Sequence, residues 1–149
     1  MTVVSDASEF TKVVKGFVAT KASGTLASTA IPVFTVAGGQ VLITSVWLLV
    51  TTSITAASTV ALQQNPTTGD TQTLVTATDL GTSDTAAGSI VGLDQGTTAA
   101  SKFLRGGRPD IDWVITIGQV EILPASANGA VTIGCTWVPL TAGATLAAA

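Results

Sequence analysis

Two carboxylates stand close together in the sequence and form the pair best placed to do chemistry. Asp110 and Asp112 open an alternating stretch, and residues two apart in a strand share one face. Paired carboxylates can bind calcium or catalyse glycoside hydrolysis. No EF-hand spacing surrounds them, and a turn Asp after Pro109 followed by a solvent-facing strand Asp explains both. We interpret the pair as structural.

The chain lacks the other groups on which catalysis and metal binding usually depend. It contains no His and no Tyr, and it has a single Cys. General acid–base chemistry most often uses His, and a Ser–His or Cys–His nucleophile is excluded. One Cys without His cannot complete a tetrahedral zinc site. We predict that the chain is not an enzyme and uses no cofactor.

The remaining candidates are one thiol and three indoles. Cys135 lies in an alternating run over residues 131–137, which predicts a buried, inert thiol. Trp47, Trp113 and Trp137 each lie within an alternating segment, which favours a role in the core or in an interface. The alternative is a platform on which a sugar stacks, as in carbohydrate-binding modules.

The composition indicates a protein that contacts other protein. The 149 residues fit one domain, and only 10% are charged, against about 25% in ordinary soluble domains. The net charge of −3 argues against nucleic-acid binding. No secretory signal opens the chain, and the most apolar run, residues 41–50, is too short to span a membrane. We expect a soluble protein made in the cytoplasm; a secreted β protein with a Thr-rich exterior is the alternative.

The chain divides into an N-terminal arm, residues 1–29, and a β domain, residues 30–149. Apolar spacing predicts a short amphipathic helix over residues 6–18, with a strand or extended arm as the alternative, and small polar residues predict a linker over 20–29. β-branched and alternating segments predict the strands, at residues 31–37, 40–52, 58–64, 71–77, 89–93, 100–104, 111–117, 120–123 and 130–140.

Turn residues suggest how these strands connect. Gly38-Gly39 and Asn128-Gly129 each predict a tight hairpin, Gly118 predicts a bulge, and residues 65–70 predict a turn. The strand over 40–52 is apolar on both faces in part, which is typical of a central strand or of one whose outer face meets a partner. The tail, residues 141–149, is expected to pack loosely or on a neighbour. We predict an all-β fold, an antiparallel β-sandwich, with a jelly roll among the arrangements it allows.

Several segments resemble the core of small virion proteins of actinobacterial tailed phages. The resemblance covers roughly residues 31–144, and its segments are residues 33–44, 50–52, 62–67 and 137–144. It implies a capsid decoration, or cement, protein: a structural protein of the outer capsid surface that binds the major capsid protein, often as a homotrimer. The N-terminal region departs from that pattern.

The basic residues are assigned to contacts on this basis. We expect residues 1–24 to lie along the capsid, so that their deletion abolishes binding and leaves the fold intact. Phe10 and Phe17 would be apolar anchors, and the cations that meet acidic groups of the shell would be Lys12, Lys15 and Lys21. A second cluster suits an acidic partner surface or a solvated loop; it comprises Lys102, Arg105 and Arg108. The alternatives to a decoration protein are a phage tail-tube or fibre component and a carbohydrate-binding surface module.

Overall fold

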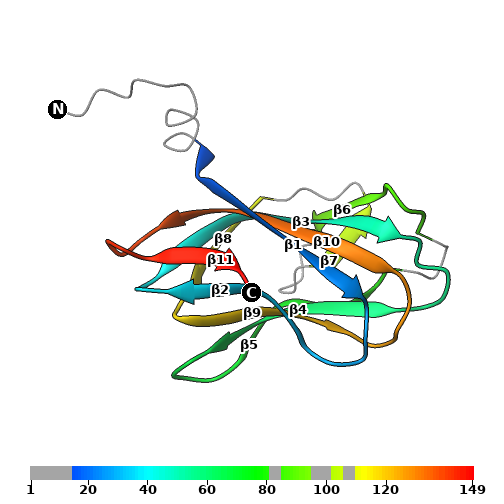
Figure 1. Ribbon diagram of the computed structural model, residues 1–149, viewed down its shortest axis with the longest axis horizontal. Helices are drawn as coiled ribbons and strands as arrows, with labels where there is room; N and C mark the ends of the chain where they lie inside the picture. The colour runs from blue at the N-terminus through cyan, green and yellow to red at the C-terminus, as the bar shows by residue number, and fades with distance from the viewer. Residues whose placement is uncertain (1–14, 81–84, 95–101, 106–109) are drawn as a thin grey trace.

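The computed structural model describes residues 15–80, 85–94, 102–105 and 110–149, with the main chain alone at 94, 102, 104, 105 and 110. Within these residues eleven strands form two sheets that pack face to face, and every pairing between neighbouring strands is antiparallel (Figure 1). The predicted all-β sandwich is therefore confirmed.

Sheet A has the strand order β1-β10-β3-β6-β7, and β8 also pairs with β3. Its strands are β1 (Phe17–Thr25), β3 (Val41–Thr52), β6 (Ile90–Asp94), β7 (Lys102–Arg105), β8 (Asp110–Ile115) and β10 (Ala130–Pro139). Sheet B has the order β11-β2-β9-β4-β5. Its strands are β2 (Ile31–Ala37), β4 (Thr59–Pro66), β5 (Gln72–Asp79), β9 (Gly118–Pro124) and β11 (Thr145–Ala148).

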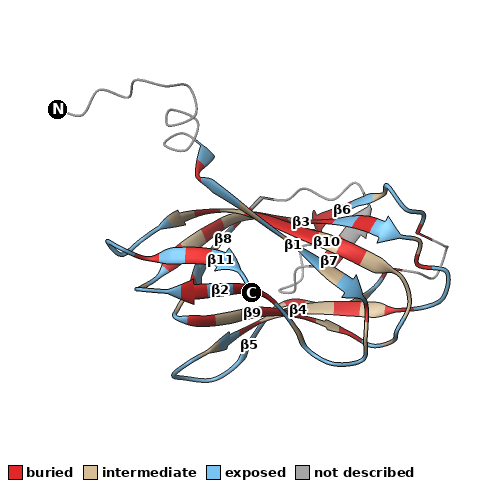
Figure 2. Ribbon diagram, in the orientation of Figure 1, coloured by how far each residue is buried: buried red, intermediate tan, exposed pale blue. Residues whose placement is uncertain are grey.

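The core lies between the two sheets because alternate residues of each strand point inward (Figure 2). In β10 the inward positions are Val131, Ile133 and Cys135, and in β9 they are Val120 and Ile122; all five are almost fully buried. Four of the five are β-branched, and such side chains suit a pleated, packed surface. The alternation seen in the sequence is thus the alternation between core and exterior.

The predicted hairpins at Gly38-Gly39 and Asn128-Gly129 are wrong. β2 and β9 belong to sheet B, whereas β3 and β10, which follow them, belong to sheet A. The glycines do adopt positive φ, at 73° for Gly38, 148° for Gly39 and 78° for Gly129. A corner between two sheets needs such conformations as much as a hairpin does. Residues 65–70, by contrast, lie in a true hairpin between the paired strands β4 and β5.

The N-terminal boundary also differs from the prediction. Residues 1–14 lie outside the described part, but residues 17–25 are the strand β1, which pairs with β10 from Phe17↔Trp137 to Thr25↔Ala130. The helix cannot include residues 17 and 18, and no linker covers 20–25. Small and β-branched residues occur both in linkers and in strands. Pairing with β10 supplies the hydrogen bonds that make residues 17–25 a strand. The sandwich therefore begins at β1 and not at residue 30.

Three later parts of the chain can be compared with their predictions. The tail contains β11, which pairs with β2 from Thr145↔Ala37 to Ala148↔Phe34, so it completes the edge of sheet B. Gly118 is not a bulge within one strand; it starts β9 where the chain crosses from sheet A to sheet B. The two weaker strand predictions, residues 89–93 and 100–104, correspond to β6 and β7, which pair with each other.

Candidate interaction surface

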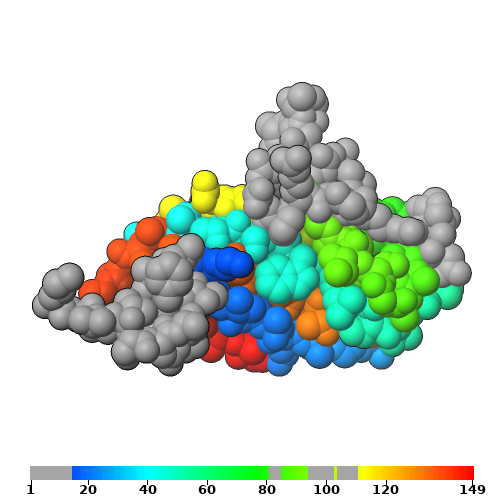
Figure 3. All heavy atoms as spheres, turned by 90° about the horizontal axis from the view of Figure 1, so that it is seen from above, coloured from blue at the N-terminus to red at the C-terminus, as the bar shows by residue number. Residues whose placement is uncertain are grey.

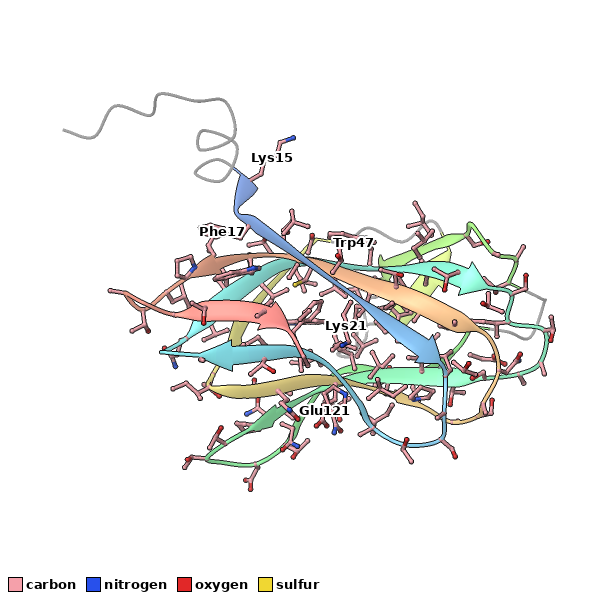
Figure 4. All side chains as sticks on the ribbon, viewed as in Figure 1. Lys15, Phe17, Lys21, Trp47 and Glu121 are labelled. Carbon is pink, nitrogen blue, oxygen red and sulfur yellow. The ribbon has the colours of Figure 1, made fainter. Side chains whose placement is uncertain are left out.

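The outer face of β1, β10 and β3 carries no charged side chain. These three adjacent strands contain one charged residue, Lys21. Its side chain points between the sheets, where Nζ donates a hydrogen bond to the main-chain oxygen of Ala149, next to β11 (Figure 4). An antiparallel sheet that faces water normally places polar or charged side chains on its outer positions. This face carries hydroxyl and apolar side chains but no charged ones, and it is called the docking face below.

Large apolar side chains project from the docking face and from its two flanking strands. Val18 of β1 is 64% exposed, Ile90 of β6 is 62% exposed and Val114 of β8 is 52% exposed. Leu49 of β3 lies directly across from Ile90 and is also exposed. Figure 3 looks down on this side of sheet A, with β1 in blue, β10 in orange and β3 in cyan. Isolated exposed apolar residues are ordinary, but a group of them on and beside an uncharged part of a sheet indicates a contact surface. Asp112, two residues from Val114 on the same face of β8, is exposed at its border.

Trp47 lies flat on the middle of this face. It pairs across strands with Gly134 of β10, and Gly134 pairs in turn with Thr20 of β1. A Cβ atom at Gly134 would lie 2.2 Å from Cζ2 and 2.3 Å from Cε2 of Trp47. The indole ring therefore occupies the space that any other side chain at position 134 would fill. The ring is supported from below by the sheet, and the residue remains half-buried.

The hydroxyl groups beside Trp47 hydrogen-bond to one another. Thr136 Oγ1 lies 2.8 Å from Thr44 Oγ1 and 2.6 Å from Ser45 Oγ. A polar group that already has a partner is much less costly to remove from water than an unpaired one. This part of the docking face can therefore be covered by a partner at low cost.

The outer face of sheet B is polar. Glu121 of β9 is only 5% exposed, and its carboxylate accepts hydrogen bonds from Gln63 Nε2 at 2.7 Å and Asn65 Nδ2 at 3.2 Å. Figure 4 shows Glu121 on the side of the sandwich opposite Trp47. The outer face of β1, β10 and β3 is thus uncharged, whereas that of sheet B holds a charged, hydrogen-bonded cluster.

Of the predicted capsid-contact residues, the described ones, Lys15, Phe17 and Lys21, do not form one surface. Phe17 stacks on Trp137 with ring centroids 4.9 Å apart, so it contributes to the end of the sandwich instead of standing free. Lys21 is bonded to Ala149, as described above. Lys15 is exposed, whereas Phe10 and Lys12 lie outside the described residues. The expectation that residues 1–24 form a separable arm is wrong, because β1 is part of sheet A.

The other candidates are described only in part. Lys102 and Arg105 belong to β7, with only their main chain described, and Arg108 lies outside the described residues. Asp112 is exposed on β8, and the side chain of Asp110 is not described. Among the described residues, no group of three His, Cys, Asp or Glu side chains gathers as metal ligands would.

A shallow cavity lies at the end of the sandwich where three turns meet. Its volume is about 340 Å³, and it is lined by Gly39, Gln40, Thr67, Thr68, Thr116 and Ile117. Its size is at the lower limit for small-molecule sites. The lining residues carry no charge and no nucleophile beyond Thr hydroxyls, so the cavity has no group suited to acid–base catalysis.

Cys135 is buried as predicted. Burial raises the pKa of its thiol from 9.0 to about 12, and a hydrogen bond from the main chain of Ala19 opposes this shift only in part. The fold therefore disfavours the thiolate. Between about pH 9 and pH 12 the unfolded chain loses its thiol proton first, so stability falls as pH rises, by up to about 1.4 kcal/mol per pH unit.

We expect this alkaline loss to be smaller in Cys135→Ala than in the wild type. Urea denaturation at pH 8, 9.5 and 11 measures the difference, and the titration of lysines cancels because both proteins contain it. Equal pH slopes for the two proteins would show that the thiol is accessible to solvent.

Among the described residues, no helix has the length and apolar character needed to cross a membrane. Comparison of the chain with protein-family models, with curated proteins and with solved structures gave no significant match in any of the three.

Proposed function

We propose that the chain is a structural virion protein that decorates a phage capsid by binding the major capsid protein. The observation that carries this proposal is the uncharged docking face on β1, β10 and β3. A sheet with apolar side chains on both faces is typical of one that is covered on both sides. From the resemblance of residues 31–144 to virion proteins, we propose that a capsid shell covers the docking face.

The difference in charge between the outer faces of the two sheets supports one orientation of the molecule on the shell. The docking face presents Val18, Trp47 and Leu49, whose removal from water is favourable by about 25 cal/mol per Å² of apolar area. The face of sheet B holds the carboxylate of Glu121, a charge to which an uncharged partner surface would offer no opposite charge. We place sheet A against the shell and sheet B toward solvent.

The strand order supports a jelly roll as the finer description of the sandwich. Without the β6–β7 hairpin and β11, the sheets have the orders β1-β10-β3-β8 and β2-β9-β4-β5. The chain passes between sheets at nearly every connection, as two interlocked Greek keys do. Jelly rolls are common in viral capsid domains and in lectins.

We retain the proposed contact between the capsid and the N-terminal arm, now limited to residues 1–14 and Lys15. Residues 1–14 precede the sandwich and contain Phe10 and Lys12, with the exposed Lys15 next to them. We expect deletion of residues 1–14 to leave the sandwich folded and to weaken capsid binding by about tenfold or more, because apolar and ionic contacts are lost. Cosedimentation with empty capsids measures this effect; binding equal to that of the full chain would remove the arm from the proposal.

The proposal itself is tested by the same assay with the full chain. Empty capsids assembled from the major capsid protein of the encoding phage should carry the protein into the pellet at a fixed ratio. Light scattering of the free protein at three times the chain mass would support the trimer that the resemblance implies. Rings or fibres in electron micrographs, without capsid binding, would instead favour a tail-tube or fibre component.

A carbohydrate-binding module is the second candidate, and Trp47 is the observation that favours it. A flat indole on the surface of a sheet is a geometry on which a sugar ring can stack. Titration with neutral mono- and oligosaccharides should then change the tryptophan fluorescence in a saturable way. No change in fluorescence across such a panel would exclude this candidate.

A further inference from the structure

We infer that Trp47 is the central contact of the docking face and that the surface it meets is an uncharged, apolar patch of another protein. This inference rests on the proposed function, because it names the residues and the chemistry through which a capsid protein would be bound. Its basis is the arrangement of Thr20, Gly134 and Trp47 in one row across β1, β10 and β3.

Gly134 holds the indole in position before any partner arrives. The ring lies over Gly134 at distances that leave no room for a Cβ atom, so the position of the ring depends on glycine at 134. A side chain already fixed in its bound geometry loses little conformational entropy on binding. Tryptophans seated in this way are typical of the few residues that dominate the energy of a protein interface.

The surroundings of Trp47 fit a dry contact. Leu49 and Ile90 lie on one side of the row and Val18 on the other, and all three are exposed apolar side chains. The hydroxyls of Thr44, Ser45 and Thr136 bond to one another and need no water. An aromatic centre bordered by residues that exclude water is the arrangement found in stable interfaces.

The docking face supplies a large part of the area of a stable interface. β3 has 12 residues, which at about 3.3 Å each gives a length of about 40 Å. Three strands at a spacing of about 4.8 Å give a width of about 14 Å. The footprint of roughly 560 Å² is about 70% of the 800 Å² or so that each partner buries in a standard protein–protein interface.

The absence of charge on the face determines the chemistry of the partner. A charged group of the partner that was buried against β1, β10 and β3 would meet no opposite charge and would remain unpaired. Burial of an unpaired charge is strongly unfavourable. The matching surface on the partner must therefore be apolar or hydroxyl-rich, as this one is.

A matched pair of charge insertions tests the inference. Thr20 is exposed on the outer face of β1 in sheet A, and Thr35 is exposed on the outer face of β2 in sheet B. Thr20→Arg places a charge beside Trp47 and should weaken binding to empty capsids by at least tenfold. Thr35→Arg adds the same charge to the opposite face and should change the affinity by less than twofold.

Gly134→Ala provides a second measurement that keeps the indole but moves it. The added Cβ must displace the ring, so this variant should also bind capsids at least tenfold more weakly. Its tryptophan emission, compared with that of the wild type before and after capsid binding, reports the displacement. Urea midpoints of the three variants show whether each is folded under the conditions of the binding assay.

The outcomes separate this inference from the function on which it rests. If the wild-type chain does not bind capsids, the proposed function is overturned. If it binds, and Thr20→Arg binds as well as Thr35→Arg, the docking face is overturned and the function stands. If the free wild-type chain forms a dimer that Thr20→Arg abolishes, the partner on this face is a second copy, and the assignment to a capsid protein is wrong.

Discussion

Replacement of Gly118 by Ala is expected to destabilise the fold by about 4 kcal/mol. Gly118 has a φ of 146°, and a Cβ there would lie 2.4 Å from the main-chain oxygen of Asn65 and 2.6 Å from Cα of Pro66. Backbone strain costs about 1–3 kcal/mol and overpacking about 1–3 kcal/mol more. Both contacts are with main-chain atoms of the β4–β5 hairpin, which cannot rotate away as a flexible side chain would.

Gly24→Ala is the matched control for this variant. Gly24 also has a positive φ, 67°, but nothing lies within 4 Å of the position that its Cβ would occupy. It should therefore show the strain alone, about 1–2 kcal/mol. Urea denaturation of both variants measures the two costs. Equal costs would contradict the close approach of β9 and the β4–β5 hairpin at the crossing between sheets.

The second large effect is expected from the core. Phe34 of β2 has no exposed surface, is among the largest fully buried side chains, and lies between Val120 of β9 and Ala148 of β11 in the ladder of sheet B. Phe34→Ala should lower the free energy of unfolding by about 3–5 kcal/mol, because it removes apolar contacts and leaves a cavity. Thermal or urea unfolding followed by tryptophan fluorescence measures this loss.

The neighbouring Thr35→Ala is the control for Phe34. Thr35 points outward from the same strand, so its truncation should cost less than about 1 kcal/mol. A large loss for Thr35→Ala together with a small loss for Phe34→Ala would place the opposite side of β2 in the core. That result would reverse the alternation on which the sandwich depends.

The sequence predicted most strands but not the sheets to which they belong. Alternation at β9 and β10 identified these strands because inward and outward positions differ in polarity, whereas β3 was identified by its long run of apolar and β-branched residues. Gly38-Gly39 and Asn128-Gly129 did not distinguish a hairpin from a corner between sheets, because both need positive φ. Sheet membership depends on which strands exchange hydrogen bonds, and those partners are distant in the sequence.

The candidate site was predicted only in part, for a related reason. The cations near the N-terminus predict contact residues in the sequence, yet Lys21 bonds across the sandwich to Ala149. Outward apolar residues such as Val18 and Ile90 look like core residues in the sequence, since both types are apolar. The useful signal was the strand over residues 40–52, which is apolar on both faces in part and which proved to be central in sheet A.

The central claim, that the docking face meets the capsid, is tested most directly by electron cryomicroscopy of capsids saturated with the purified chain. At a resolution that separates the two sheets, we expect sheet A to face the shell, with Trp47 in contact with the major capsid protein and the outer face of sheet B, with the exposed Thr35, directed to solvent. Density in which sheet B faces the shell, or particles that carry no added density, would contradict the account.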